Sequence, residues 1–188
     1  MRRRASIAAI LSVAFCFLAF SPHARADQND ARLAQLFTQL RATKDKAEAA
    51  RLTRTIWAVW FEARNPAVRE LVLRGQTHLR LRRIAVAAEL FNHIVKIAPD
   101  YAEGWNRRAT VRYLLGNYQG SLRDINRTLK LEPRHFGALS GRGLVLIKLG
   151  RHRAAIAAFK AALAINPHLD SARLNIRALR KKLGEKAI

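Results

Sequence analysis

Apolar residues recur at helical spacing through most of this chain, and no segment shows the strict alternation of a half-buried β-strand. Tyr118, Leu122, Ile125 and Leu129 illustrate the pattern, because residues three and four positions apart share one face of a helix. Glycine and proline fall between such segments, where turns are expected. The sequence therefore predicts an all-α fold built from pairs of short helices.

A period of 34 residues organises these helices. The residues that repeat at this interval are the prolines Pro99, Pro133 and Pro167, the glycines Gly116 and Gly150, and the small residues Gly75, Ala109 and Gly143. A fixed period at unrelated residue types is typical of stacked helix–turn–helix units, which form an extended concave surface. We expect three such units across 68–167, with the small residues where paired helices approach closely.

The turn inside each unit requires a residue in the left-handed conformation after the first helix. Gly116 and Gly150 hold this place in the second and third units, whereas the first unit has Arg82. Because a Cβ atom disfavours that conformation, the turn of the first unit is expected to be less regular than the other two.

The three units resemble tetratricopeptide repeats. Trp105 to Ala109 covers the start of that family's pattern, and Ala87-x3-Phe91 and Ala155-x3-Phe159 match its second helix. The resemblance implies a right-handed solenoid whose first helices line a concave groove, with Trp105 in the core. It also implies a function in binding proteins or peptides, although the lysine and asparagine pattern with which some relatives clamp a C-terminal carboxylate is not reproduced.

An arginine departs from the family's pattern at the same place in each unit: Arg74, Arg108 and Arg142. A buried arginine needs an acidic partner, and Asp124 is the expected partner of Arg108, forming a clasp between two helices. Glu89 is a substitute partner for Arg74. The third unit has no acid at this place, so Arg142 is expected to reach solvent or to turn toward the groove.

Two helical segments flank the units. Residues 27–67 predict an N-terminal helical hairpin, and because Trp57 stands 34 residues before Phe91, a degenerate fourth repeat is one interpretation of it. Trp57 and Trp60 are expected in its core rather than in a ligand cage. Residues 168–188 predict a C-terminal capping helix with a basic tail, for which membrane contact is the alternative role.

Residues 1–26 have the pattern of a cleavable signal peptide. Arginines at positions 2–4 precede an apolar run from Ala5 to Phe20, and Ala24-Arg25-Ala26 offers small residues for cleavage after Ala26. We expect an exported bacterial protein, periplasmic or secreted, with an uncleaved anchor as the alternative. The single cysteine, Cys16, lies in this segment, so the mature chain has no disulfide and no thiolate metal site.

The chain carries 35 Lys and Arg against 13 Asp and Glu, a formal net charge of +22. Such an excess favours anionic partners. For an exported protein these are an acidic protein or peptide, an anionic membrane surface or envelope polysaccharide, and no nucleic acid is expected. Solubility alone is the alternative explanation of the charge.

No pattern of catalytic or metal-binding residues stands out. The histidines lack the spacing of metal ligands, and the sequence contains neither a nucleophile elbow nor a glycine loop of the kind that binds phosphate. We therefore expect no enzyme activity, no metal and no cofactor.

Two surfaces are candidate binding sites. The groove residues expected on the exposed side of the first helices are Arg69, Gln76, Asn106, Arg107, Thr110, Ser140, Gly141, Leu144 and Lys148. Gly137, Ser140 and Gly141 are small and are expected to open a recess beside Asn106. The basic edge made by the helix–helix turns comprises Arg82, Arg83, Arg151 and Arg153.

Each surface predicts a different function. The groove favours a non-catalytic adaptor of the cell envelope that binds a protein or peptide, with acidic groups of the partner on its arginines. The basic edge favours the alternative, a peripheral module that binds anionic lipid or envelope polysaccharide.

Overall fold

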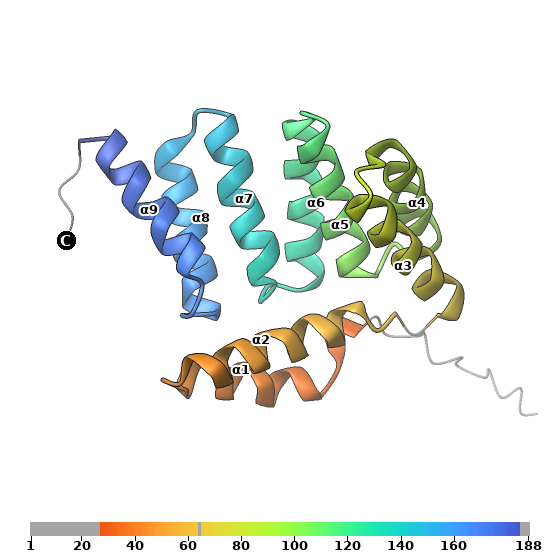
Figure 1. Cartoon of the computed structure of the whole chain (residues 1–188), viewed down its shortest axis with the longest axis horizontal. Coiled ribbons are helices and arrows are strands. Elements are labelled where there is room, and N and C mark those ends of the chain that lie inside the picture. Colours follow the sequence, from red (N-terminus) through yellow and green to blue (C-terminus); the bar gives the residue numbers. More distant parts are fainter. Residues whose placement is uncertain (1–26, 64, 185–188) are drawn as a thin grey trace, which may run out of the picture.

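The computed structural model describes residues 27–63 and 65–184, and every regular element in these two ranges is a helix (Figure 1). The elements are a short 3-10 helix, η1, at Asp27–Asn29, followed by α1 at Arg32–Ala42, α2 at Lys46–Phe61, α3 at Pro66–Arg80, α4 at Ile84–Ile97, α5 at Ala102–Leu114, α6 at Tyr118–Leu131, α7 at Phe136–Lys148, α8 at His152–Ile165 and α9 at Asp170–Lys182. The predicted signal segment lies outside the described residues. Of the helices described, none has the length and apolar character needed to cross a membrane.

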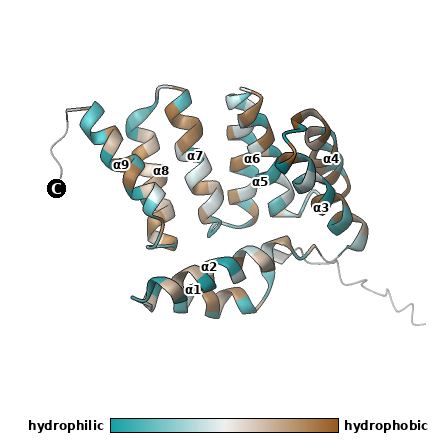
Figure 2. Cartoon of the chain, in the orientation of Figure 1, coloured by the Kyte–Doolittle hydropathy of each residue, from teal (hydrophilic) through white to brown (hydrophobic). Residues whose placement is uncertain are grey.

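Helices α3 to α8 stack as three pairs, and α9 covers the open side of the last pair (Figure 1). Contacts are densest within the pairs α3–α4, α5–α6 and α7–α8, and α4–α5 and α6–α7 join neighbouring pairs. Figure 2 shows hydrophobic and hydrophilic residues alternating along these helices, as expected when one face is buried. The predicted all-α solenoid of three repeats with a capping helix is confirmed.

Small residues let the paired helices approach. A Cβ atom on Gly143 would lie 2.5 Å from Cζ of Phe159, so any side chain there would force the helices apart. The first pair repeats this arrangement. In the second pair the same places hold Ala109 and Ile125, both buried, so the extra methyl group of alanine faces a smaller side chain than phenylalanine.

The turn of the first pair is as regular as the other two, although it lacks a glycine. Arg82 has a φ of 59°, against 76° for Gly116 and 71° for Gly150. In all three turns, the N–H of the following residue donates a 2.8 Å hydrogen bond to a carbonyl five residues back: Arg83 to His78, Asn117 to Arg112, and Arg151 to Leu146. The expectation of a less regular first turn is wrong, because these helix-end hydrogen bonds are kept with arginine in the left-handed conformation.

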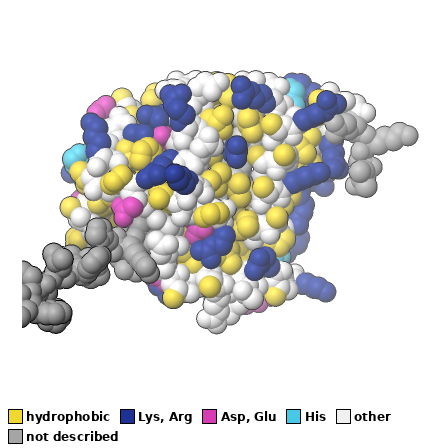
Figure 3. All heavy atoms as spheres, turned by 180° about the vertical axis from the view of Figure 1, so that it is seen from behind, with side chains coloured by type: hydrophobic (Ala, Val, Ile, Leu, Met, Phe, Trp, Pro, Cys, Tyr) yellow, Lys and Arg dark blue, Asp and Glu magenta, His cyan; other side chains and the backbone are white. Residues whose placement is uncertain are grey.

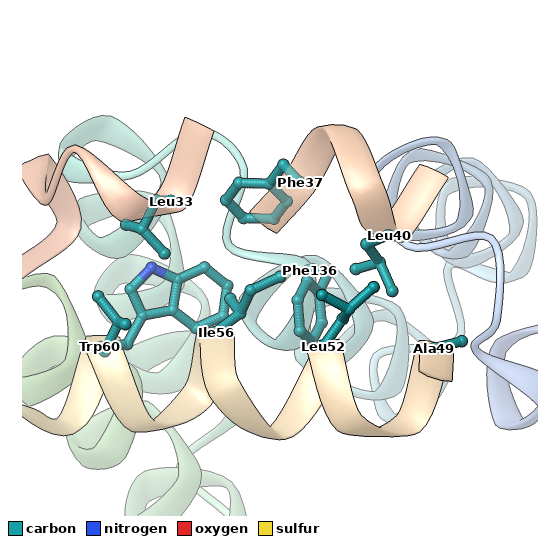
Figure 4. Packing of buried hydrophobic residues seen from close by; sticks show 9 residues of the cluster. Leu33, Phe37, Leu40, Ala49, Leu52, Ile56, Trp60 and Phe136 are labelled. Carbon is teal, nitrogen blue, oxygen red and sulfur yellow. The ribbon is translucent and has the colours of Figure 1, made fainter. Parts of the chain in front are cut away.

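The N-terminal hairpin of α1 and α2 does not continue the stack. Figure 1 shows it lying across the ends of the array helices, along the edge formed by the turns α4–α5, α6–α7 and α8–α9. Figure 4 shows its core, which draws on α1, α2 and the first residue of α7: Leu33, Phe37, Leu40, Ala49, Leu52, Ile56, Trp60 and Phe136. The interpretation of 27–67 as a degenerate repeat is therefore corrected, since the hairpin packs its apolar face on turns rather than on a neighbouring helix pair.

Each of the three turns contacts the hairpin. The Tyr101 hydroxyl donates to the Trp60 carbonyl at 3.0 Å, and Asn166 donates to a threonine hydroxyl of α2 at 3.2 Å. At the middle turn, the His135 ring stacks on Trp60 with ring centroids 4.0 Å apart. Trp60 is buried and Trp57 half-buried, which confirms that both serve packing.

Among the described residues, the buried hydrophobic side chains form four clusters. The clusters draw their members from the hairpin, the three helix pairs and α9. A chain that begins at Asp27 retains all four of these clusters and is expected to fold.

Candidate peptide-binding groove

The first helices of the pairs, α3, α5 and α7, line the candidate groove, which contains a recess between α5, α6 and α7. The recess has a volume of about 90 Å³, room for one small side chain of a ligand. Its lining residues are Asn106, Ala109, Thr110, Tyr113, Ser121, Ile125, Gly137, Gly141, Leu144 and Val145. Most of these groups are apolar, and a few amide and hydroxyl groups stand beside them.

Two glycines of α7 have different roles in this recess. A Cβ atom on Gly141 would meet only Ile125, at an ordinary contact distance of 3.8 Å, so the absent side chain leaves open space. A Cβ atom on Gly137 would lie 2.5 Å from the Trp57 ring, so Gly137 is small because α2 lies against it. Trp57 thereby packs against Gly137, one of the residues that line the recess.

A buried polar cluster joins the groove to the hairpin. Glu103 is 1% exposed and accepts hydrogen bonds from Asn106 at 2.9 Å and from Arg107 at 2.5 Å. Nδ1 of His135 accepts the backbone N–H of Ala138, so the ring proton lies on Nε2, which donates to Glu103 at 2.9 Å. Burial raises the pKa of Glu103, but the charge of Arg107 and the hydrogen bond from His135 outweigh burial and hold the pKa below its usual value.

The comparisons with known proteins agree with this architecture. A sequence model of the tetratricopeptide repeat family matches residues 106–170. A TPR repeat-containing protein of Rhizobium etli is 34% identical over 152 residues, which cover 81% of this chain and 74% of that protein. The chain belongs to the tetratricopeptide repeat (TPR) family.

Solved TPR structures share the fold. The TPR domain of Arabidopsis OM64 has a TM-score of 0.59 at 22% identity, over 61% of this chain and 95% of that domain. The first TPR domain of Spaghetti (RPAP3), bound to the HSP90 peptide SRMEEVD, has a TM-score of 0.61 at 18% identity, over 63% of this chain and 94% of that domain. At these identities the likeness establishes the TPR solenoid and nothing about the partner of this chain.

The TPR groove contains some of the predicted residues and not others. Asn106, Thr110, Gly141 and Leu144 line the recess together, whereas Ser140 does not. Gln76 is half-buried on α3, and the exposed Arg69 donates to the carbonyl of Ala63. Lys148 is exposed at the end of α7.

Arg107 is not a free groove residue. Its guanidinium group is bonded to Glu103 and lies 4.4 Å from the centroid of the Phe61 ring, so it fixes α5 to the hairpin. The second-helix residues Ser121 and Ile125 also line the recess, and the sequence reasoning missed them. Ile125 could have been identified from the sequence, because the equivalent residue of each neighbouring repeat is phenylalanine. The smaller isoleucine leaves space beneath Asn106.

The clasp of the second repeat consists of two arginines on one carboxylate. Arg108 donates two hydrogen bonds to Asp124, at 2.9 and 2.8 Å, and Arg112 contacts the same carboxylate at 2.9 Å. Arg112 belongs to this cluster but was not foreseen. In the first repeat, Arg74 and Glu89 are both exposed, and among the described residues they form no ion pair with each other, so the expected pairing is not present.

The basic edge lies opposite the hairpin, where the turns α3–α4, α5–α6 and α7–α8 meet (Figure 1). Arg82, Arg83 and Arg151 are exposed there, and Arg153 is exposed but makes a contact of its own. Residues 76–88, 110–122 and 144–156, which form this edge, include no Asp or Glu. Figure 3 shows one face of the molecule on which Lys and Arg side chains are many and acidic side chains few.

The described residues hold no group of three His, Cys, Asp or Glu side chains arranged to bind a metal ion. The buried acid of the groove, Glu103, has all its bonds directed to Asn106, Arg107 and His135. Glu103 therefore holds Asn106, Arg107 and His135 in place relative to one another.

Proposed function

We propose that this protein is a non-catalytic adaptor that binds an extended peptide segment of a partner protein in its concave groove. The observation that carries the proposal is the recess between α5 and α7, where Gly141 leaves space for a small side chain beside the amide of Asn106. Exposed Leu73 on α3 and Leu144 on α7 add apolar contact surface to the first helices. Arg69 and Lys148 supply the charge that an acidic partner would meet.

The test uses a chain from Asp27 onward as bait in an envelope extract. Gly141→Trp is expected to block the recess, since a Cβ atom at this position meets only Ile125, at 3.8 Å, and the indole ring extends from there into the space that a ligand would occupy. The control is Ala85→Trp, on the exposed part of α4. We expect proteins captured by the wild type and the control, identified by mass spectrometry, to be lost with Gly141→Trp. Equal capture by all three chains, each with an unchanged melting temperature, would exclude the groove.

We also propose export to the periplasm or the outside of the cell. The support is the sequence of residues 1–26, with its basic start, apolar run and small residues before Asp27. Mass spectrometry of the protein recovered from an envelope fraction is expected to find Asp27 at the N-terminus. Retention of Met1 would contradict this proposal.

A second candidate function is binding of an anionic membrane surface through the basic edge. One observation favours lipid over polysaccharide: Leu81, Leu114 and Leu115 are 55%, 52% and 57% exposed among the basic residues of this edge. Leucines can enter the interface of a bilayer while arginines contact the head groups, at about 1 kcal/mol for each basic residue.

Flotation with vesicles of phosphatidylcholine, with and without phosphatidylglycerol, tests this candidate on the chain from Asp27. Neutralising Arg80, Arg82 and Arg83 to Gln is expected to weaken binding to the anionic vesicles by about fivefold per residue. The control neutralises Arg41, Lys44 and Arg54 on the hairpin, an equal change in net charge on the opposite edge. An equal loss in both variants would show that net charge alone, and not this edge, drives binding.

A further inference from the structure

The second and third repeats differ at one pair of equivalent positions. In the second repeat, the carboxylate of Asp124 accepts two hydrogen bonds from Arg108. In the third repeat, 34 residues later, the arginine is kept as Arg142, but Ala158 stands where the carboxylate would be. Within the described part of the chain, Arg142 makes no hydrogen bond or ion pair of the kind that joins Arg108 to Asp124. The third repeat therefore keeps the donor of the clasp without its acceptor.

A cavity of about 440 Å³ occupies this place. It lies between α6, α7 and α8, and its lining is Leu122, Leu139, Arg142, Leu146, Arg151, Ala154, Ala157, Ala158 and Ala161. The side of α7 that faces it carries Leu139, Arg142 and Leu146, whereas Gly141 and Leu144 face the groove. The cavity is thus separate from the proposed peptide groove, and Arg142 does not turn toward the groove.

We propose that this cavity is a binding site for a carboxylate of an acidic peptide segment, which takes the place that Asp124 holds in the second repeat. Arg142 donates the two parallel hydrogen bonds that its equivalent Arg108 donates, and Arg151 supplies a second positive charge at the rim. The surrounding alanines and leucines contact the aliphatic part of the ligand.

Physical chemistry favours a carboxylate over other ligands here. A half-buried guanidinium group gains most from a planar anion that accepts two hydrogen bonds at once. The only polar side chains of the lining are the two arginines, so a ligand that must donate hydrogen bonds finds no acceptor side chain among the lining residues. The small alanines of α8 leave the space that a Glu side chain or a chain terminus needs.

The test follows the arginine side-chain N–H signals by NMR in the chain from Asp27. Two probes separate the sources of the carboxylate: N-acetyl-Gly-Glu-Gly-amide offers a side chain, and N-acetyl-Gly-Gly-Gly offers a C-terminus. N-acetyl-Gly-Gln-Gly-amide is the uncharged control. We expect a saturable shift of the Arg142 signal, assigned by its loss in Arg142→Gln, with at least one acidic probe and not with the control.

Ala158→Asp and Ala158→Asn are the matched variants. The aspartate supplies the missing carboxylate inside the protein, so it is expected to pair with Arg142, raise the melting temperature and abolish the shift. The asparagine has nearly the same shape without the charge and is expected to keep the shift. The proposal is overturned if neither acidic probe shifts the Arg142 signal, or if Ala158→Asp leaves the shift intact.

Discussion

Phe159 lies so close to Gly143 that a methyl group on the glycine would stand 2.5 Å from the ring. In the second repeat, the equivalent positions hold Ala109 and Ile125, which are both buried. The larger residue on the first helix is thus accompanied by a smaller residue on the second helix. This relationship means that the size of each residue is set by the other rather than by the fold alone.

Gly143→Ala is therefore expected to lower the free energy of unfolding by about 1–3 kcal/mol, the usual cost of an extra methyl group in a packed core. Adding Phe159→Ile should recover much of this loss, because the pair then matches the second repeat. Urea unfolding of both variants measures the effect. Gly141→Ala is the control in the same helix: its Cβ atom meets open space, so it should be neutral or stabilising. Equal losses at Gly141 and Gly143 would contradict the steric explanation.

The array was predictable from the sequence because the residues that pack the paired helices recur every 34 residues. The recess was predictable in part, since Gly141 and Asn106 stand side by side in the expected register. The position of the hairpin was not predictable. Its apolar face, which contains Trp60, indicates burial, but no local sequence pattern indicates that this face covers Tyr101 and His135 in the turns.

Trp105 shows a second limit of the pattern. The family resemblance placed this residue in the core, yet it is only half-buried. Its Nε1 donates to the Pro99 carbonyl, and the guanidinium groups of Arg108 and Arg127 lie 4.7 and 5.8 Å from its ring centroid. The two arginines cover the ring where other side chains would bury it, so the loss on Trp105→Ala should be smaller than the roughly 3–5 kcal/mol typical of a core aromatic.

Arg82 adopts a left-handed conformation that glycine occupies in the other two turns. Arg82→Gly is therefore expected to stabilise the protein by about 1 kcal/mol, because glycine pays no steric penalty there. Thermal unfolding checks this. Arg82→Ala removes the same charge but keeps the Cβ atom, so it should not stabilise. A gain of equal size in both variants would point to relief of charge repulsion on the basic edge instead of backbone conformation.

The clasp of the second repeat predicts unequal single mutants. Asp124→Ala leaves both Arg108 and Arg112 without their carboxylate, whereas Arg108→Ala leaves Asp124 with Arg112. The aspartate variant should therefore lose more stability than the arginine variant, and the double mutant should lose less than the sum of the two. A double-mutant cycle from urea unfolding measures this coupling. Additive losses would show that Arg108 and Asp124 do not stabilise each other.

The lowered pKa of Glu103 predicts how stability depends on pH. A carboxyl group whose pKa is lower in the folded than in the unfolded protein stabilises the fold above its unfolded pKa. That contribution disappears as the pH falls below about 4.5, the usual value, and through the lower pKa of the folded state. Glu103→Gln keeps the shape but removes the charge that Arg107 and His135 contact.

We therefore expect Glu103→Gln to lower the free energy of unfolding at pH 7 by about 1–3 kcal/mol, as for a buried polar group deprived of its partner. The difference from the wild type should shrink as the pH falls through the window below 4.5, because the wild type then loses the same charge. Urea midpoints across this range measure both curves. Glu70→Gln, at an exposed position on α3, should follow the wild type at every pH. A constant difference between Glu103→Gln and the wild type would show that Glu103 acts through packing, because only the ionised form of the wild type can lose a contribution on protonation.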